Sequence, residues 1–268
     1  MYINTKSKET IEQSLCEILN INDTELNDLI DDCYKEYQKD KQVLILDNQY
    51  DYFFNYVKKQ QSKDIGKVKF IHLSRRLDDD NVGYNFKDLI TKDTTLSSFM
   101  KKYGITFKDD NHIKMMIDNQ EVLLEKNDDY SSYYLKDRFG YRFNDFNFKG
   151  YMFEDGLENS ELYETFEQGP EFFGYLFSFI NDDKMIDDFY QQSSYYKFEY
   201  LVPLNLIYFE DYNELNDQDK QSHIIVRSLQ RLYNYKYDPI MNNMENRIIG
   251  IIDNQNLSGE YLVNKVSI

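Results

Sequence analysis

The sequence predicts an α+β protein in which a helical N-terminal segment precedes a core built on a mixed or antiparallel sheet. Amphipathic helical patterns fill the first 63 residues, and runs of β-branched and aromatic residues begin only at residue 67. Beyond that point helices and strands are interleaved without a strict β-α-β order, which favours α+β over a doubly wound parallel sheet. We therefore expect a helical segment over residues 1–63 and an α+β core domain over residues 64–268.

The N-terminal segment carries three predicted helices. In the first, over residues 10–19, the spacing of Ile11, Leu15 and Ile18 places them on one face. The second runs over residues 22–37, with acidic side chains in its first turn that complement the helix dipole. The third covers residues 49–59, and the apolar run between the second and third helices, residues 42–47, predicts a short strand.

The core domain alternates strands and helices. A hairpin is expected over residues 112–125, with its turn at 118–120, and further strands are expected over residues 67–74, 146–153, 197–209, 247–253 and 259–268. Helices are expected over residues 94–103 and 129–139, each followed by a glycine, over 158–195 with a break at Gly169-Pro170, and over 218–235. Pro203 indicates a sheet edge or a strand end, because proline donates no ladder hydrogen bond.

Composition restricts the class of protein. The 25 Tyr and 19 Phe supply enough apolar surface for a full core, although the chain has neither Ala nor Trp. A formal net charge of −17 repels phosphate backbones, which disfavours generic nucleic-acid binding and favours a basic partner, if any. The N-terminus is polar and no apolar run is long enough to cross a membrane, so we expect a cytoplasmic protein. The chain has only two cysteines, at no metal-binding spacing, so we expect a reducing compartment and no metal site.

Three residues in predicted strands form the one set that suggests chemistry. His72 lies in the strand KFIHLS, Tyr151 in FNFKGYMF, and Glu260 at the start of the last strand, SGEYLV. In order and placement the set resembles the His-Tyr-Glu pattern of the ADP-ribosyltransferase fold of the diphtheria-toxin and poly(ADP-ribose) polymerase type. The resemblance covers three short segments of residues 67–268 and implies an ADP-ribosyltransferase-like sheet core with NAD⁺ as substrate.

The resemblance also implies a role for each residue. Glu260 would stabilise the oxocarbenium-like transition state and orient a ribose hydroxyl, His72 would hold the adenosine-side ribose, and Tyr151 would stack on nicotinamide. Ser74, Arg75 and Arg76 follow the histidine and complete the expected NAD-binding set, since an arginine binds pyrophosphate well.

Each of these residues also has an ordinary structural interpretation. A histidine on an apolar strand is commonly a hydrogen-bonded core residue, Tyr151 is one of 25 tyrosines, and Glu260 is a charge at a strand end. Two other carboxylates are alternative candidates for a functional role. Glu171 would complement a helix dipole, and Glu199 is either a rival catalytic carboxylate or part of an exposed strand face.

Two functions from different classes follow from these observations. The first is an intracellular NAD-dependent ADP-ribosyltransferase acting as a toxin, in phage defence or as a phage effector. The second is a non-catalytic acidic interaction protein, an inhibitor or DNA mimic that occupies a basic groove on a partner. The modified target, the oligomeric state and the role of residues 1–63 are not readable from the sequence.

Overall fold

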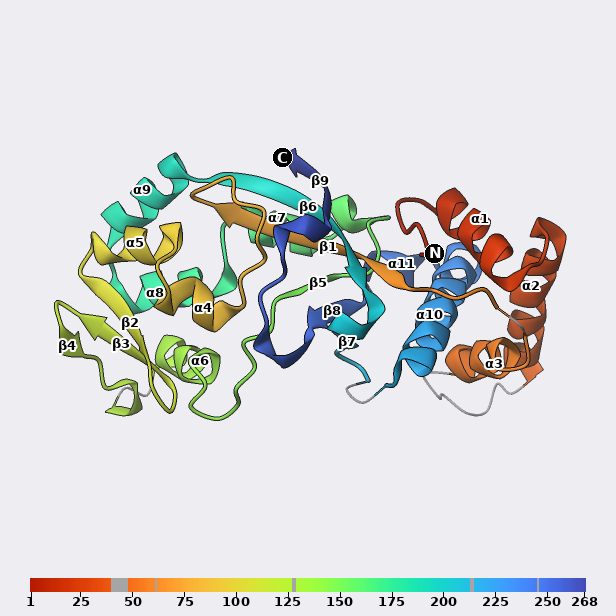
Figure 1. Ribbon diagram of the computed structural model, residues 1–268, viewed down its shortest axis with the longest axis horizontal. Helices are drawn as coiled ribbons and strands as arrows, with labels where there is room; N and C mark the ends of the chain where they lie inside the picture. Colours follow the sequence, from red (N-terminus) through yellow and green to blue (C-terminus); the bar gives the residue numbers. More distant parts are fainter. Residues whose placement is uncertain (40–47, 61, 127–128, 213–214, 245) are drawn as a thin grey trace. The chain divides into compact units, whose positions relative to one another are not determined.

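The α+β class is confirmed. The computed structural model describes residues 1–39, 48–60, 62–126, 129–212, 215–244 and 246–268 (Figure 1). The strand expected over residues 42–47 lies outside this range. By backbone contacts the chain divides into two compact units. Unit 1 comprises Met1–Ile71, Gly150–Ser160 and Tyr200–Ile249, and unit 2 comprises His72–Lys149, Glu161–Glu199 and Gly250–Ile268. The predicted domain boundary at residue 63 falls inside unit 1.

Unit 1 is organised around one long helix, α10 (Asp217–Tyr237). The helices α1 (Lys8–Leu19), α2 (Asp23–Lys39) and α3 (Asn48–Val57) all contact it, as Figure 1 shows. The predicted apolar face of α1 is buried, with Ile11, Leu15 and Ile18 fully enclosed. A capping box between Ser7 and Thr10 fixes the start of this helix. The short helix α11 (Pro239–Met244) follows α10.

Unit 2 has an aromatic core enclosed by short helices and a small sheet. The strands β2 (Ile105–Asp109), β3 (Ile113–Ile117) and β4 (Gln120–Glu121) form an antiparallel sheet in the order β2-β3-β4. The helices α4 (Phe86–Thr91) and α5 (Thr95–Lys101) contact β2. The unit also contains α6 (Tyr130–Arg138), α7 (Glu161–Glu167), α8 (Glu171–Ile180) and α9 (Asp183–Gln192). Phe86, Phe139 and Phe173 are among its buried rings.

The larger sheet has six strands among the described residues, in the order β7-β8-β5-β1-β6-β9. Their bounds are β1 Lys67–Arg76, β5 Lys149–Tyr151, β6 Ser194–Pro203, β7 Ile207–Phe209, β8 Ile248–Ile251 and β9 Leu262–Ser267. β1 and β5 are antiparallel, with Ile71 directly opposite Tyr151. β6 ends at Pro203, in agreement with the prediction that this proline marks a strand end.

Most predicted elements appear close to their expected bounds. The hairpin turn forms at Asp118 and Asn119, which both have positive φ, and the break before α8 falls at Gly169-Pro170. The strand expected over residues 197–209 is interrupted by a 3₁₀ turn at Leu204–Leu206, and the one expected over residues 146–153 is ordered as a strand for only three residues. Within the described residues, helices long and apolar enough to cross a lipid bilayer are absent.

Close packing of β5 against β1 leads to a testable prediction about glycine. A Cβ on Gly150 would lie 2.4 Å from Cε1 of Phe70 and 2.5 Å from the carbonyl oxygen of Ile71. We expect Gly150→Ala to lower the free energy of unfolding by about 1–3 kcal/mol, the usual cost of overpacking. The matched control is Gly174→Ala in α8, where nothing lies within 4 Å, and it should instead stabilise by about 1 kcal/mol. Urea denaturation of both variants measures the difference, and equal stabilities would contradict this packing.

Candidate functional site: the acidic flank of α2

His72 occupies a structural position within unit 2. Its Nδ1 lies 2.8 Å from the carbonyl oxygen of Lys149, so this nitrogen carries the proton and donates. The ring packs against Phe148 at a centroid distance of 4.2 Å and against Phe198 at 6.3 Å. Burial and the nearby Arg76 together lower the pKa of His72 to about 3. The imidazole is therefore neutral at pH 7 and is held by aromatic contacts.

The three residues expected to bind the NAD pyrophosphate region follow His72 along β1. Arg75 donates from Nε to Oγ of Ser193 at 2.8 Å and from its other nitrogens to carbonyl oxygens of residues 167, 190 and 193. Arg76 donates to the carbonyl oxygens of Asp80 and Val82 and lies over the ring of Phe198. Ser74, which precedes both arginines on β1, is half-buried. Both guanidinium groups thus have partners within the protein.

The strand register places Tyr151 away from His72. Directly opposed residues of an antiparallel pair point to the same face, so Tyr151 shares the face of Ile71. His72 follows Ile71 and therefore points to the other face. The surroundings of Gly150 agree, because a Cβ there would meet the ring of Phe70, which lies on the same face of β1 as His72. The expected sharing of a nicotinamide–ribose site by the imidazole and the phenol has no support in this register.

The expected carboxylates occupy three different environments. Glu260 is exposed in a 3₁₀ turn at Gly259–Tyr261, just before β9, so it precedes the strand instead of starting it. Glu199 is buried on β6 and accepts a hydrogen bond from Nδ2 of Asn264 at 2.9 Å, in contrast to the exposed strand face considered for it. Glu171 is exposed in the first turn of α8, as expected of a residue that complements the helix dipole.

Unit 1 contains a buried polar network that the sequence does not indicate. His223 of α10 is fully buried, with Nδ1 2.9 Å from the Tyr50 hydroxyl and Nε2 3.4 Å from a carboxylate oxygen of Asp211. Arg227, one turn further along α10, donates to the same carboxylate, and Arg247 lies 3.7 Å from it. These residues come from α3, α10, the segment after β7 and the start of β8, which are far apart in the sequence.

The charges of this network follow from its burial. Burial opposes ionisation of the Asp211 carboxyl, but His223, Arg227 and Arg247 outweigh it and lower its pKa to about 2. Burial lowers the pKa of His223, so this imidazole is neutral at pH 7. A phenol, a neutral imidazole and a carboxylate in this sequence could pass a proton from one to the next. His223 is 0% and Tyr50 8% exposed, however, so neither side chain is accessible to a substrate. The network therefore serves mainly to hold the segment after β7 against α10.

A row of exposed carboxylates lies along one flank of α2. It consists of Glu25, Asp28, Asp32 and Glu36, which we call the acidic flank. Their spacing of three and four residues places them on one side of the helix, next to the buried stripe formed by Leu26, Leu29, Ile30 and Cys33. At 1.5 Å per residue the row extends over about 16 Å, long enough to meet several side chains of a partner.

Two tyrosines of α3 border the acidic flank. Burial raises the pKa of Tyr52, and the nearby carboxylates Asp32 and Glu36 raise it further. Burial also raises the pKa of Tyr56. A hydrogen bond from Gln60 lowers this pKa, and the negative charge of Glu25 raises it further. The phenol groups thus lie within the electrostatic reach of the carboxylates. Aromatic rings beside carboxylates suit cationic side chains, which make ion pairs and cation–π contacts there.

Glu25 helps to cap the start of α2 through its hydrogen bond from Asn22, but the fold derives little benefit from the other three carboxylates of the acidic flank. Carboxylates four residues apart on a helix repel each other by about 0.2–0.5 kcal/mol per pair. Asp32 and Glu36 also lie in the C-terminal half of α2, where the helix dipole disfavours negative charge. An ion pair of Asp32 with Lys35 at 2.8 Å offsets this only in part, because both side chains are more than half exposed. Asp28, Asp32 and Glu36 are thus better explained by binding than by stability.

The neutral state of the half-buried His72 imidazole predicts a pH dependence. Because its folded pKa, about 3, lies below its ordinary value of 6.5, the unfolded chain binds more protons between these two pH values. Stability should therefore fall as the pH drops from 6.5 towards 3, and be unaffected by His72 above 6.5. In His72→Asn, whose amide can still donate to Lys149, the slope of unfolding free energy against pH should decrease by about one proton. Urea titrations at several pH values measure this, and an unchanged slope would contradict the neutral imidazole.

Comparisons of the chain with protein-family models, with curated proteins and with solved structures find no match.

Proposed function

We propose that this chain is a non-catalytic interaction protein whose acidic flank of α2 binds a basic partner, in the manner of an inhibitor or a DNA mimic. The observation that carries the proposal is the helix-spaced row of exposed carboxylates beside Tyr52 and Tyr56. A net charge of −17 adds long-range attraction for a positively charged partner. Such attraction mainly accelerates encounter, while close pairing on the flank supplies specificity.

The flank also meets the chemical requirements of such a surface. Its carboxylates are exposed, so that binding a basic side chain requires little rearrangement of the protein. The opposite flank of α2 is already engaged within unit 1, where Asp31 accepts hydrogen bonds from Lys236 and Tyr237 and the rings of Tyr34 and Tyr237 stack at 3.9 Å. One flank therefore anchors α2 to α10, and the other carries the exposed row of carboxylates.

Variants with matched charge test this proposal. We expect the triple variant Asp28→Asn, Asp32→Asn, Glu36→Gln to bind a fluorescent hexalysine peptide roughly tenfold more weakly, a loss of about 1.4 kcal/mol. The control carries Glu164→Gln, Asp183→Asn and Asp187→Asn, exposed positions of unit 2, and so has the same net charge. It should bind almost as the unmodified protein does. Fluorescence anisotropy over a range of salt concentrations measures both.

Thermal unfolding checks that the flank variant is folded. Removing two repulsive pairs on α2 should leave its Tm unchanged or slightly raised. Equal weakening of binding in the flank and control variants would mean that only net charge matters, and the proposal would fail. Binding that does not weaken with salt would contradict it as well, because exposed charges are screened.

The ADP-ribosyltransferase activity implied by the sequence resemblance stays a prediction. Since His72 and Tyr151 point to opposite faces of their strands, we expect NAD⁺ not to raise the Tm of the protein. A ligand that binds only the native state must stabilise it, so differential scanning fluorimetry with and without NAD⁺ measures this directly. A clear rise in Tm would support the resemblance, and loss of NAD⁺ turnover in Glu260→Ala would then assign the carboxylate.

A further inference from the structure

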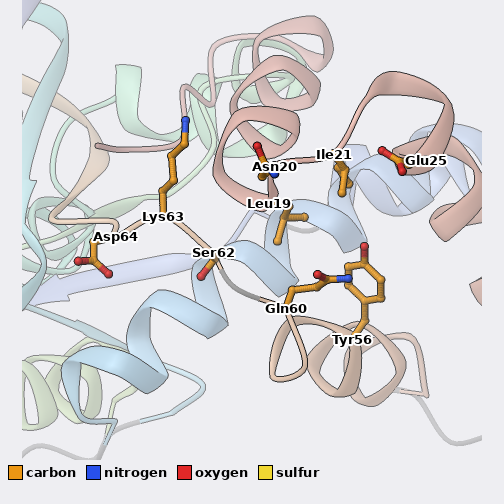
Figure 2. A pocket seen from close by; sticks show the side chains of 9 residues that line it. All are labelled: Leu19, Asn20, Ile21, Glu25, Tyr56, Gln60, Ser62, Lys63 and Asp64. Atoms are coloured by element: carbon orange, nitrogen blue, oxygen red, sulfur yellow. The ribbon is translucent and has the colours of Figure 1, made fainter.

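A hollow of about 960 Å³ lies in unit 1 beside the acidic flank (Figure 2). It is formed where α1 and α3 end and α2 begins, together with the segment that leads to β1. Its lining is polar apart from two aliphatic side chains and comprises Leu19, Asn20, Ile21, Glu25, Tyr56, Gln60, Ser62, Lys63 and Asp64. Pockets for small ligands commonly have volumes of about 300–1,000 Å³, so a long side chain fits easily.

The electrostatic character of the hollow differs between its two ends. At one end Lys63 is paired with Glu17 at 3.4 Å, and the N-terminal ammonium donates to the carbonyl oxygen of Asp64 at 3.2 Å. At the other end lie Glu25 and Tyr56, whose pKa the Glu25 charge helps to raise, and Figure 2 shows Ile21 near both. Cations therefore already occupy the surroundings of Asp64, and the Glu25–Tyr56 end is the part suited to a new cation.

Two helix ends strengthen the attraction for a cation at this place. The helices α1 and α3 both terminate at the hollow, and the C-terminus of a helix carries a partial negative charge. α1 ends there with Asn20 in the left-handed conformation, its backbone N–H donating to the carbonyl oxygen of Cys16. The N-terminus of α2 also lies at the hollow and carries a partial positive charge. Two negative helix ends against one positive end leave a net negative potential, which favours binding of a single positive charge.

The chemistry at the Glu25–Tyr56 end favours a guanidinium over an ammonium group. Guanidinium is planar, so it can stack on the ring of Tyr56 and at the same time pair with a carboxylate. One oxygen of Glu25 already accepts a hydrogen bond from the backbone N–H of Asn22 at 2.8 Å, which holds the carboxylate in place. The side-chain amides of Asn20 and Gln60 add carbonyl oxygens that can accept further N–H groups.

We infer that this hollow takes an arginine side chain of the basic partner, with its guanidinium group between Glu25 and Tyr56. The inference rests on the proposed function, because the hollow opens at Glu25, the first carboxylate of the acidic flank. The flank then supplies general attraction for a basic segment, and the hollow distinguishes arginine from lysine within it.

The test compares hexa-arginine with hexalysine, two labelled peptides of equal length and charge. The unmodified protein should bind hexa-arginine more tightly, by roughly two- to tenfold, the range expected for a cation–π contact. Tyr56→Leu should abolish this preference by weakening hexa-arginine binding much more than hexalysine binding, and Tyr56→Phe should retain it. Glu25→Gln keeps an oxygen for Asn22 but removes the charge, so it should also reduce the preference. Tyr130→Leu, at an exposed tyrosine of unit 2, is the matched control.

The outcomes separate this inference from the proposed function. If the triple variant of the acidic flank binds hexalysine as tightly as the unmodified protein, the proposed function fails. If that variant binds weakly but Tyr56→Leu still prefers hexa-arginine as strongly as before, only the arginine site is wrong. Equal binding of the two peptides by the unmodified protein would also overturn the site. If spermidine displaced hexa-arginine as effectively as argininamide does, the hollow would be a general cation site without a preference for guanidinium.

Discussion

The burial of α10 is the constraint on which unit 1 depends. From Lys220 to Tyr233 nearly every residue of this helix is buried, although the segment contains a histidine and two arginines. Charged groups in such a position need partners, because desolvation without pairing costs several kcal/mol. Arg227 pairs with Asp211 and Arg231 with Asp155, so two distant segments of the chain are bound to one helix. Breaking either pair would leave a buried cation, and therefore these carboxylates are fixed by the fold.

The same reasoning separates two classes of carboxylate in this very acidic chain. Asp211, Asp155 and Glu154 pair with buried cationic side chains and so compensate the charges of the protein interior. The carboxylates of the acidic flank contact solvent, repel one another along the helix, and in part oppose the helix dipole. A net charge of −17 is by itself consistent with simple solubility. It is the regular row beside tyrosines, at the entrance to a hollow, that distinguishes α2 from the rest of the acidic surface.

Local patterns predicted the elements better than they predicted the site. The buried face of α1 follows from the spacing of Ile11, Leu15 and Ile18, and the break at Gly169-Pro170 follows from the conformations of two residues. His72 was assigned correctly to a strand, but its partner is the backbone of Lys149, which no side-chain pattern reveals. The Tyr50–His223 contact joins residues 173 positions apart, so sequence spacing carries no trace of it. The sequence shows that the segment is acidic, but the carboxylates form a row only because the helix places residues three and four apart on the same side.

The positions of His72 and Tyr151 in their strands show why a motif needs its register. Both residues lie in strands as predicted, and the two strands are hydrogen-bonded neighbours. A shift of one residue in a strand nevertheless reverses which face a side chain occupies. With Ile71 opposite Tyr151, Gly150 falls on the face of Phe70, and the absence of a side chain there admits the phenyl ring. A register moved by one residue would place Tyr151 against that ring. The packing that fixes the sheet is thus the same feature that directs the phenol away from the imidazole.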